Sequence, residues 1–62
     1  MKITGSADGS FRIELTRDEL GILNDCINEA LQLPDWEFPI RVGAKKQEAE
    51  ALLAAIGRVL GR

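Results

Sequence analysis

The chain has 62 residues, of which 45% are hydrophobic and 29% are charged, and its net charge is −2. This length predicts a single domain over residues 1–62, and the composition argues against an intrinsically disordered chain. The net negative charge disfavours nucleic acid and anionic lipid as partners and favours a protein partner with a basic surface.

The sequence offers neither a covalent nor a metal staple. Cys26 is the only cysteine and there is no histidine, which excludes an internal disulfide and argues against a zinc site. A domain this small gains little net stability from its core, so association with another chain is the remaining way to stabilise the fold. No segment has the apolar length of a signal peptide or a membrane span, which favours a cytoplasmic protein.

Two short segments at the N-terminus, residues 1–4 and 11–15, are predicted to form a β-hairpin. The loop between them, GSADGS, consists of residue types that favour a turn. In the second segment the apolar residues alternate from Phe11 to Leu15, which is the period of a strand with one buried face. The other face of the hairpin is expected to lie in solvent.

A helix is predicted over residues 17–32. The Thr16 hydroxyl can accept a hydrogen bond from the backbone amide of Glu19, whose side chain reaches back to Thr16, as in a capping box. Pro34 disfavours helical geometry at the residue before it and ends the helix. The apolar side covers nearly half the circumference, which predicts two packing neighbours rather than one. Its residues are Leu20, Ile22, Leu23, Cys26, Ile27, Ala30, Leu31 and Leu33.

A third strand is predicted over residues 36–42, because apolar and polar side chains alternate there. The predicted inward set is Trp36, Phe38, Ile40 and Val42, and the outward set is Glu37, Pro39 and Arg41. Pro39 has no amide hydrogen to donate, so this strand is expected at the edge of the sheet.

An apolar stripe after Gly43 predicts a second helix over residues 44–60. The stripe contains Ala49, Leu52, Leu53, Ile56, Val59 and Leu60. The order ββαβα then predicts an α+β fold, a two-layer domain in which two helices pack on one face of a small three-stranded sheet. Either strand of the hairpin can be the central one. The sheet edge that carries no proline is available to pair with a second copy or with another protein's strand.

Groups suited to catalysis are scarce. The chain lacks histidine and tyrosine, its two serines lie in the hairpin loop, and Cys26 falls within the apolar side of the first helix, where a buried inert thiol is expected. Gly43 to Lys46 is similar to an anion-binding helix start, but the spacing of a phosphate-binding loop is missing, and a solvated turn is the simpler interpretation. We therefore expect no enzyme activity, no cofactor and no metal.

The first helix carries an acidic row. Three carboxylates that begin at Asp18 project within about 40° of one another, with Ile22 beside them. A basic protein surface would favour such a row, and acidic residues from Asp35 onward would extend it. The alternative is a face that is only solvated. The candidate partner-binding residues are Asp18, Ile22, Asp25, Glu29, Asp35, Glu37 and Arg41.

Short motifs follow one another at fixed spacings along nearly the whole chain, in the pattern EL..DEL..LN...NEAL....WEF..R.G....EA..LL that starts at Glu14. This pattern resembles a group of short, mostly uncharacterised bacterial proteins, some of which are immunity proteins of toxin systems. The motifs are mainly core and capping residues, so the resemblance implies a shared fold more directly than a shared activity. The role it implies is neutralisation of a toxin by direct binding.

The sequence thus favours a non-catalytic protein-binding domain, an immunity protein or antitoxin that occludes a bacterial toxin. The first alternative is a self-associating structural or regulatory module, a homodimer formed through the open strand edge or the wide apolar side of the first helix. The second alternative, nucleic-acid binding, has to overcome the net acidity. It would use Arg41, Lys45, Lys46, Arg58 and Arg62.

Overall fold

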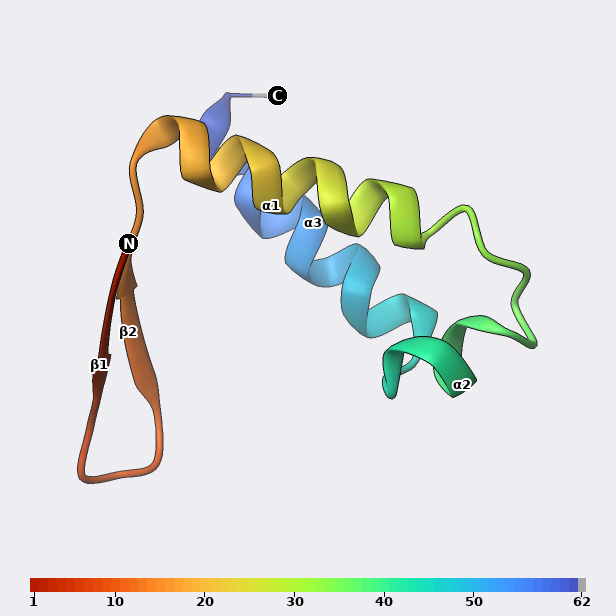
Figure 1. Ribbon diagram of the computed structural model, residues 1–62, viewed down its shortest axis with the longest axis horizontal. Helices are drawn as coiled ribbons and strands as arrows, with labels where there is room; N and C mark the ends of the chain where they lie inside the picture. Colours follow the sequence, from red (N-terminus) through yellow and green to blue (C-terminus); the bar gives the residue numbers. More distant parts are fainter. Residues whose placement is uncertain (62) are drawn as a thin grey trace.

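A computed structural model describes residues 1–61 and has α+β architecture (Figure 1). Two strands form a hairpin at the N-terminus, and three helices follow. The elements are β1 (Lys2–Gly5), β2 (Phe11–Glu14), α1 (Arg17–Ala30), α2 (Phe38–Val42) and α3 (Lys46–Leu60).

The predicted hairpin is present as an antiparallel pair in which Ile3 lies opposite Ile13 and Lys2 lies opposite Glu14. Its loop is closed by a backbone hydrogen bond from Ser6 N to Ser10 O of 2.9 Å. The Asp8 carboxylate accepts from both the Ser10 amide and the Ser10 hydroxyl, at 3.0 and 2.7 Å. The aspartate and serine residues that predicted a turn therefore form the hydrogen bonds that close this loop.

The predicted capping box at the start of α1 is confirmed. Thr16 Oγ1 accepts from Glu19 N at 3.1 Å, and Glu19 Oε1 accepts from Thr16 N at 2.9 Å. The helix ends at Ala30, two residues before the predicted end, and the chain continues through tight turns in which Leu33 N donates to Ala30 O at 3.1 Å. These shorter bonds satisfy the last carbonyls of the helix just ahead of Pro34.

The prediction of a third strand over residues 36–42 is wrong, and the sheet of the described residues has two strands. Residues 35–37 form a turn and α2 follows, with Phe38 N donating to Pro34 O at 3.0 Å. Pro39 suits the first turn of a helix, because the amide it lacks has no intrahelical partner there. The alternation of apolar residues thus misled the prediction, since a run this short fits a helical turn as well as a strand.

This correction changes which side chains form the core. Phe38 is completely buried, as predicted, whereas Trp36 is 70% exposed and Ile40 is 75% exposed. Val42 is also exposed, so only one of the four residues predicted to point inward does so. A helical repeat of 3.6 residues separates Phe38 from Trp36 and Ile40 by a large angle, whereas a strand would have placed all three on one face.

Helices α1 and α3 run antiparallel and pack against each other (Figure 1). Arg17 at the start of α1 donates to the Leu60 carbonyl at the end of α3, at 2.8 Å. Helix α3 begins two residues after the predicted start, and Gly61 ends it in the left-handed region at φ 78°. Among residues 1–61 the buried side chains are few, and they lie in α2 and α3: Phe38, Ala49 and Leu60.

The hairpin stands away from the helices, so that the molecule has an open, bent shape (Figure 1). Both faces of the hairpin are exposed, which differs from the predicted two-layer arrangement of helices on a sheet. In the part of the chain that the structure describes, no helix is long and apolar enough to cross a lipid bilayer.

Candidate functional site

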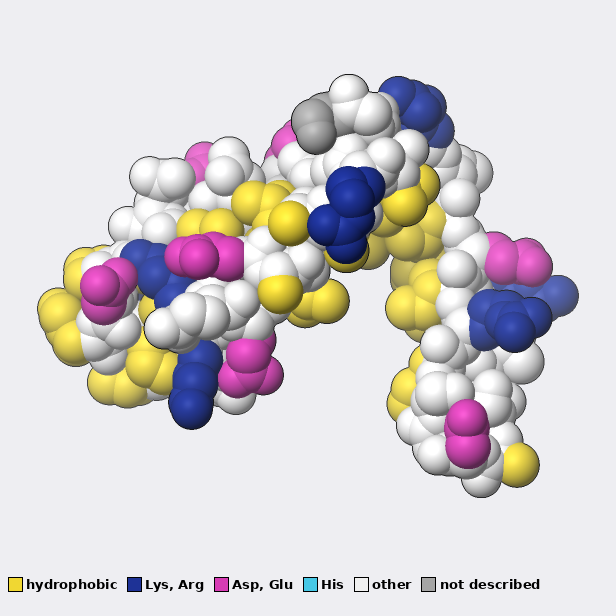
Figure 2. All heavy atoms as spheres, turned by 180° about the vertical axis from the view of Figure 1, so that it is seen from behind, with side chains coloured by type: hydrophobic (Ala, Val, Ile, Leu, Met, Phe, Trp, Pro, Cys, Tyr) yellow, Lys and Arg dark blue, Asp and Glu magenta, His cyan; other side chains and the backbone are white. Residues whose placement is uncertain are grey.

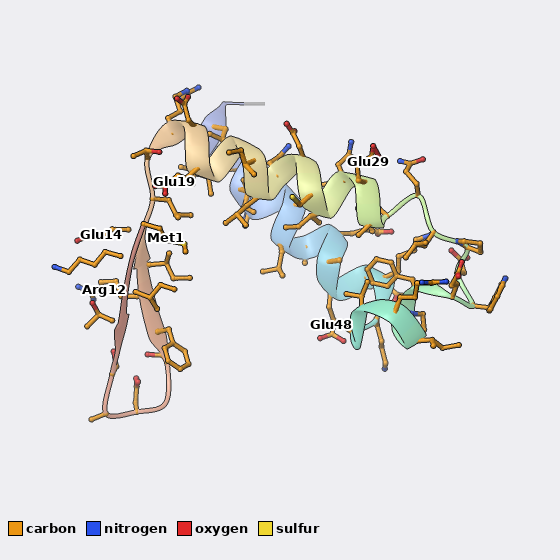
Figure 3. All side chains as sticks on the ribbon, in the orientation of Figure 1. Met1, Arg12, Glu14, Glu19, Glu29 and Glu48 are labelled. Carbon is orange, nitrogen blue, oxygen red and sulfur yellow. The ribbon has the colours of Figure 1, made fainter. Side chains whose placement is uncertain are left out.

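The acidic row lies on the exposed side of α1, on successive turns. Asp18, Asp25 and Glu29 are exposed, and Ile22 among them is 62% exposed. At about 100° per residue, the offsets of seven and eleven residues from Asp18 bring the three carboxylates to one side of the helix. Figure 3 shows Glu29 projecting from α1 on the side away from the hairpin.

Two neighbouring hollows lie along this side. The first has a volume of about 470 Å³ and is lined by Ile22, Asp25, Cys26 and Glu29. The second includes Arg17, Asp18 and Leu60 and shares Ile22 and Asp25 with the first. These shared residues join the hollows into one surface, which we call the acidic α1 face and define by Asp18, Ile22, Asp25, Cys26 and Glu29.

Cys26 belongs to this face, and the prediction that its thiol is buried is wrong, because Cys26 is exposed. The side of α1 that packs against α3 is carried by Leu20, Ile27 and other half-buried residues. Cys26 lies about 100° around the helix from Ile27, outside that contact. The predicted second neighbour of α1, which would have covered Cys26, is not formed within the chain.

Asp35 is placed elsewhere, in an ion pair. Its carboxylate accepts from Lys46 Nζ at 2.8 Å, and the same ammonium group donates to the Leu33 carbonyl at 2.8 Å. The hydrogen bond from Lys46 lowers the pKa of the Asp35 carboxyl, and the charge of Lys46 lowers it further. Asp35 lines a separate polar hollow with Lys45 and Glu50 among its neighbours, so it does not extend the row on α1.

Glu37 and Arg41 pair with each other one helical turn apart, with Arg41 Nε donating to Glu37 Oε1 at 2.7 Å. The structure therefore groups Asp18, Ile22, Asp25 and Glu29 on one face, and it separates Asp35, Glu37 and Arg41 into two pairs near α2. In each pair a cation lies beside the carboxylate and offsets its negative charge.

The basic residues of the nucleic-acid alternative do not share one helix face in the described part of the chain. Lys46 is engaged with Asp35, and Arg41 is engaged with Glu37. Lys45 is the N-cap residue just before α3, where its backbone amide donates to Glu48 Oε1 at 3.2 Å, and Arg58 lies in the last turn of that helix. Arg62 lies outside the described residues.

Other titratable groups have structural partners. A backbone hydrogen bond from Thr16 lowers the pKa of the Glu19 carboxyl, and the N-terminal ammonium group, at 3.0 Å, lowers it further. Hydrogen bonds from Ser10 lower the pKa of Asp8 in the hairpin loop. Within residues 1–61, no three histidine, cysteine or carboxylate side chains lie close enough together to hold a metal ion.

Comparisons with protein families, with curated proteins and with solved structures give no match.

Proposed function

We propose that the chain is a non-catalytic protein-binding domain that docks a basic partner on its acidic α1 face. The observation that carries this proposal is a row of three exposed carboxylates beside the exposed Ile22 and Cys26, over two joined hollows. An apolar centre with a charged rim is the usual composition of a protein-binding surface.

The two kinds of residue have different roles in this proposal. The carboxylates attract a positively charged partner, raise the association rate and fix its orientation. Ile22 and Cys26 supply the apolar contact that is desolvated when the partner docks, and this part of the surface slows dissociation. A partner that fits has an apolar residue surrounded by lysine or arginine side chains.

We further propose that the partner is a bacterial toxin and that the chain is its immunity protein or antitoxin. This step rests on the resemblance of the EL..DEL..LN...NEAL....WEF..R.G....EA..LL pattern to a group that includes immunity proteins. A toxin that acts on nucleic acid would need a basic surface to hold the phosphate backbone, and an acidic protein can occlude such a surface by direct binding. Neutralisation then needs no catalytic group in this chain.

The test is co-expression of the chain with the product of a neighbouring toxin-like gene, followed by affinity purification and a growth assay. The expected result is copurification and protection of the host cells. Asp25→Lys combined with Glu29→Lys should raise the Kd at least about 100-fold and abolish protection, because it places cations against a basic surface. Circular dichroism checks that this variant keeps its helices.

A matched control carries the same change in charge at other sites. Glu14→Lys combined with Glu50→Lys changes the net charge from −2 to +2, as does the double variant on α1, since each replacement of an acid by lysine adds two charges. Glu14 lies on the hairpin and Glu50 on α3, both exposed. If both double variants weaken binding equally, net charge and not the acidic α1 face is responsible. If neither does, the face is not the docking surface.

A further inference from the structure

One side of the hairpin is an apolar surface that nothing in the chain covers. Ile3 and Ile13 form a cross-strand pair on this side, and Phe11 lies over Gly5, with 3.7 Å between its ring and the position of a Cβ atom at that glycine. Ile3, Phe11 and Ile13 are all more than half exposed, and so is Met1. Figure 2 shows hydrophobic side chains along the side of the hairpin that faces the helices.

The opposite face of the hairpin is polar, which makes the exposure of the first face unusual. Lys2 and Glu14 lie across from each other on it, next to Arg12. Figure 3 shows Arg12 and Glu14 on the side away from the helices, and Met1 on the other side. A strand that alternates in this way is typical of a sheet that buries one face, and a two-stranded hairpin without such a layer is only marginally stable in water.

The helix pair carries a second uncovered apolar surface. Leu52 and Val59, seven residues apart on α3, are 60% and 74% exposed, and Leu23 on α1 is 40% exposed. Each helix packs against the other through a stripe of buried or half-buried residues, such as Ile27 on α1 and Leu60 on α3. At about 100° per residue, Leu23, Leu52 and Val59 lie beside these stripes, displaced around each helix in the same rotational sense. Because α1 and α3 run antiparallel, the two flanks fall on the same side of the pair, which we call the helix flank. Figure 2 shows hydrophobic side chains on the helices toward the hollow beside the hairpin.

The accessible area of the chain measures how much surface remains uncovered. It is 4970 Å², whereas a compact monomer of 6.8 kDa is expected to expose about 3,950 Å², so about 1,000 Å² is in excess. The radius of gyration is 13.0 Å, compared with about 10.6 Å for a compact domain of this length. The excess is comparable to what one subunit buries in a stable dimer.

The chain's own hairpin is poorly placed to cover its helix flank. Residues 15 and 16 alone separate β2 from α1, and the capping box fixes Thr16 in an extended conformation with ψ 164°. The ammonium group of Met1, the residue before β1, is also paired with Glu19 of α1, at 3.0 Å. These contacts hold the hairpin at an angle to the helices, so that its apolar face looks into the open hollow.

We propose that a second copy of this chain fills the hollow, with the apolar face of each hairpin packed on the helix flank of the other copy. A sheet face and a helix pair are the two surfaces that a two-layer domain brings together, and here each copy supplies one of each to its partner. Such an exchange is symmetric about a two-fold axis. If each copy covers its excess area, the interface totals about 2,000 Å², which is the size of a homodimer interface.

The dimer leaves the acidic α1 face available. The three carboxylates of this face lie about 120–160° around α1 from Leu23, so they point away from the helix flank, and Cys26, about 60° from Leu23, lies at the edge between the two surfaces. The polar face of each hairpin also stays in solvent. The two-copy assembly would therefore carry two partner-binding faces, and its formation does not depend on the proposed toxin.

The first test is the mass of the full chain by light scattering between 1 and 200 µM, with an expected value of twice 6.8 kDa. Ile3→Glu and Leu52→Glu should each raise the dimer Kd at least about 100-fold, because each buries an unpaired charge. Thr4→Glu, on the polar face of β1, and Ala54→Glu, on an exposed side of α3, are the matched controls and should leave the Kd within about threefold. A wild-type monomer at 200 µM overturns the proposal.

The second test does not depend on the folding of a variant. In dimers mixed from isotope-labelled and unlabelled wild-type chains, isotope-filtered NMR detects contacts between copies only. Contacts between Ile3 or Ile13 methyl groups of one copy and Leu52 or Val59 methyl groups of the other support the arrangement. The same contacts in an unfiltered spectrum, without a counterpart in the filtered one, would show closure of a single chain, and filtered contacts at other surfaces would show a different dimer. Either result overturns the proposal.

Discussion

The helical part of the molecule and the N-terminal hairpin have equally clear sequence patterns, but only the helical part packs against another element of the chain. The helices are joined by the buried Phe38 ring, by the bond from Arg17 to the Leu60 carbonyl and by the contacts of Lys46. The hairpin has its own register and a well-formed loop, but its apolar face has no layer beneath it. Local patterns thus form an element without supplying the surface against which it packs, and in this chain we infer that a second copy supplies it.

The largest effect is expected from Phe38→Ala in the helical part. Phe38 is the one large side chain that is fully buried among the described residues, and removing a buried phenylalanine costs about 3–5 kcal/mol. In a domain of this size such a loss should leave most chains without their helices, as measured by circular dichroism and urea titration. Trp36→Ala, two residues away and exposed, should cost less than about 1 kcal/mol. Equal losses would contradict the assignment of α2.

Gly43→Ala tests the corner between α2 and α3. Gly43 has φ 79°, and an alanine in this left-handed region costs about 1–2 kcal/mol. No atom lies within 4 Å of the position of the added Cβ, so the cost should come from the backbone and not from a clash. Gly43→Asn should therefore recover part of the loss of unfolding free energy, since asparagine tolerates this region. Alanine as stable as glycine would show that the turn has another conformation.

Thr16→Ala tests the junction between the two regions. The Thr16 hydroxyl accepts the amide of Glu19, and loss of such a cap costs about 1 kcal/mol. Thr16→Ser keeps the acceptor and should keep most of the stability in a urea titration. Because the cap also fixes the angle of the hairpin, Thr16→Ala should weaken dimer formation more than Thr16→Ser does. An unchanged dimer Kd in both variants would show that dimer formation does not depend on the angle of the hairpin.

The smallest effect expected is a dependence of stability on acid. The pKa values of Glu19 and Asp35 lie below their ordinary values of 4.5 and 3.8. Their contribution to stability is complete above these ordinary values and is lost as the pH falls through the lowered values of the folded state. The urea midpoint should therefore fall as the pH is taken from neutral to below 3.8. Glu19→Gln with Asp35→Asn should flatten this dependence, and an unchanged slope would assign it to other carboxylates.

Much of the fold could be predicted from local signals. Alternation and loop chemistry gave the hairpin, and the pairing of Thr16 with Glu19 gave the start of α1. Residues 36–42 were misassigned because a short apolar run has no intrinsic period that separates a strand from a helical turn. The deciding contact, burial of Phe38 without Trp36, depends on the rest of the chain.

The candidate site was predictable to a similar extent. The acidic row follows from helical spacing alone, whereas the pairing of Asp35 with Lys46 spans eleven residues through a turn that the sequence did not reveal. The exposure of Cys26 was missed because the wide apolar side of α1 was assigned two neighbours within one chain. In the proposed dimer the second copy covers Leu23 at one edge of this apolar side, whereas Cys26 stays on the acidic α1 face.

The most direct test of the proposed function is an NMR titration of the isotope-labelled chain with the toxin that copurifies with it in the co-expression experiment. The account predicts that the largest shift changes occur at Asp18, Ile22, Asp25 and Glu29, while Ile3 and Ile13 on the hairpin keep their shifts. Changes confined to the hairpin or to α2, with the acidic α1 face unaffected, would contradict it.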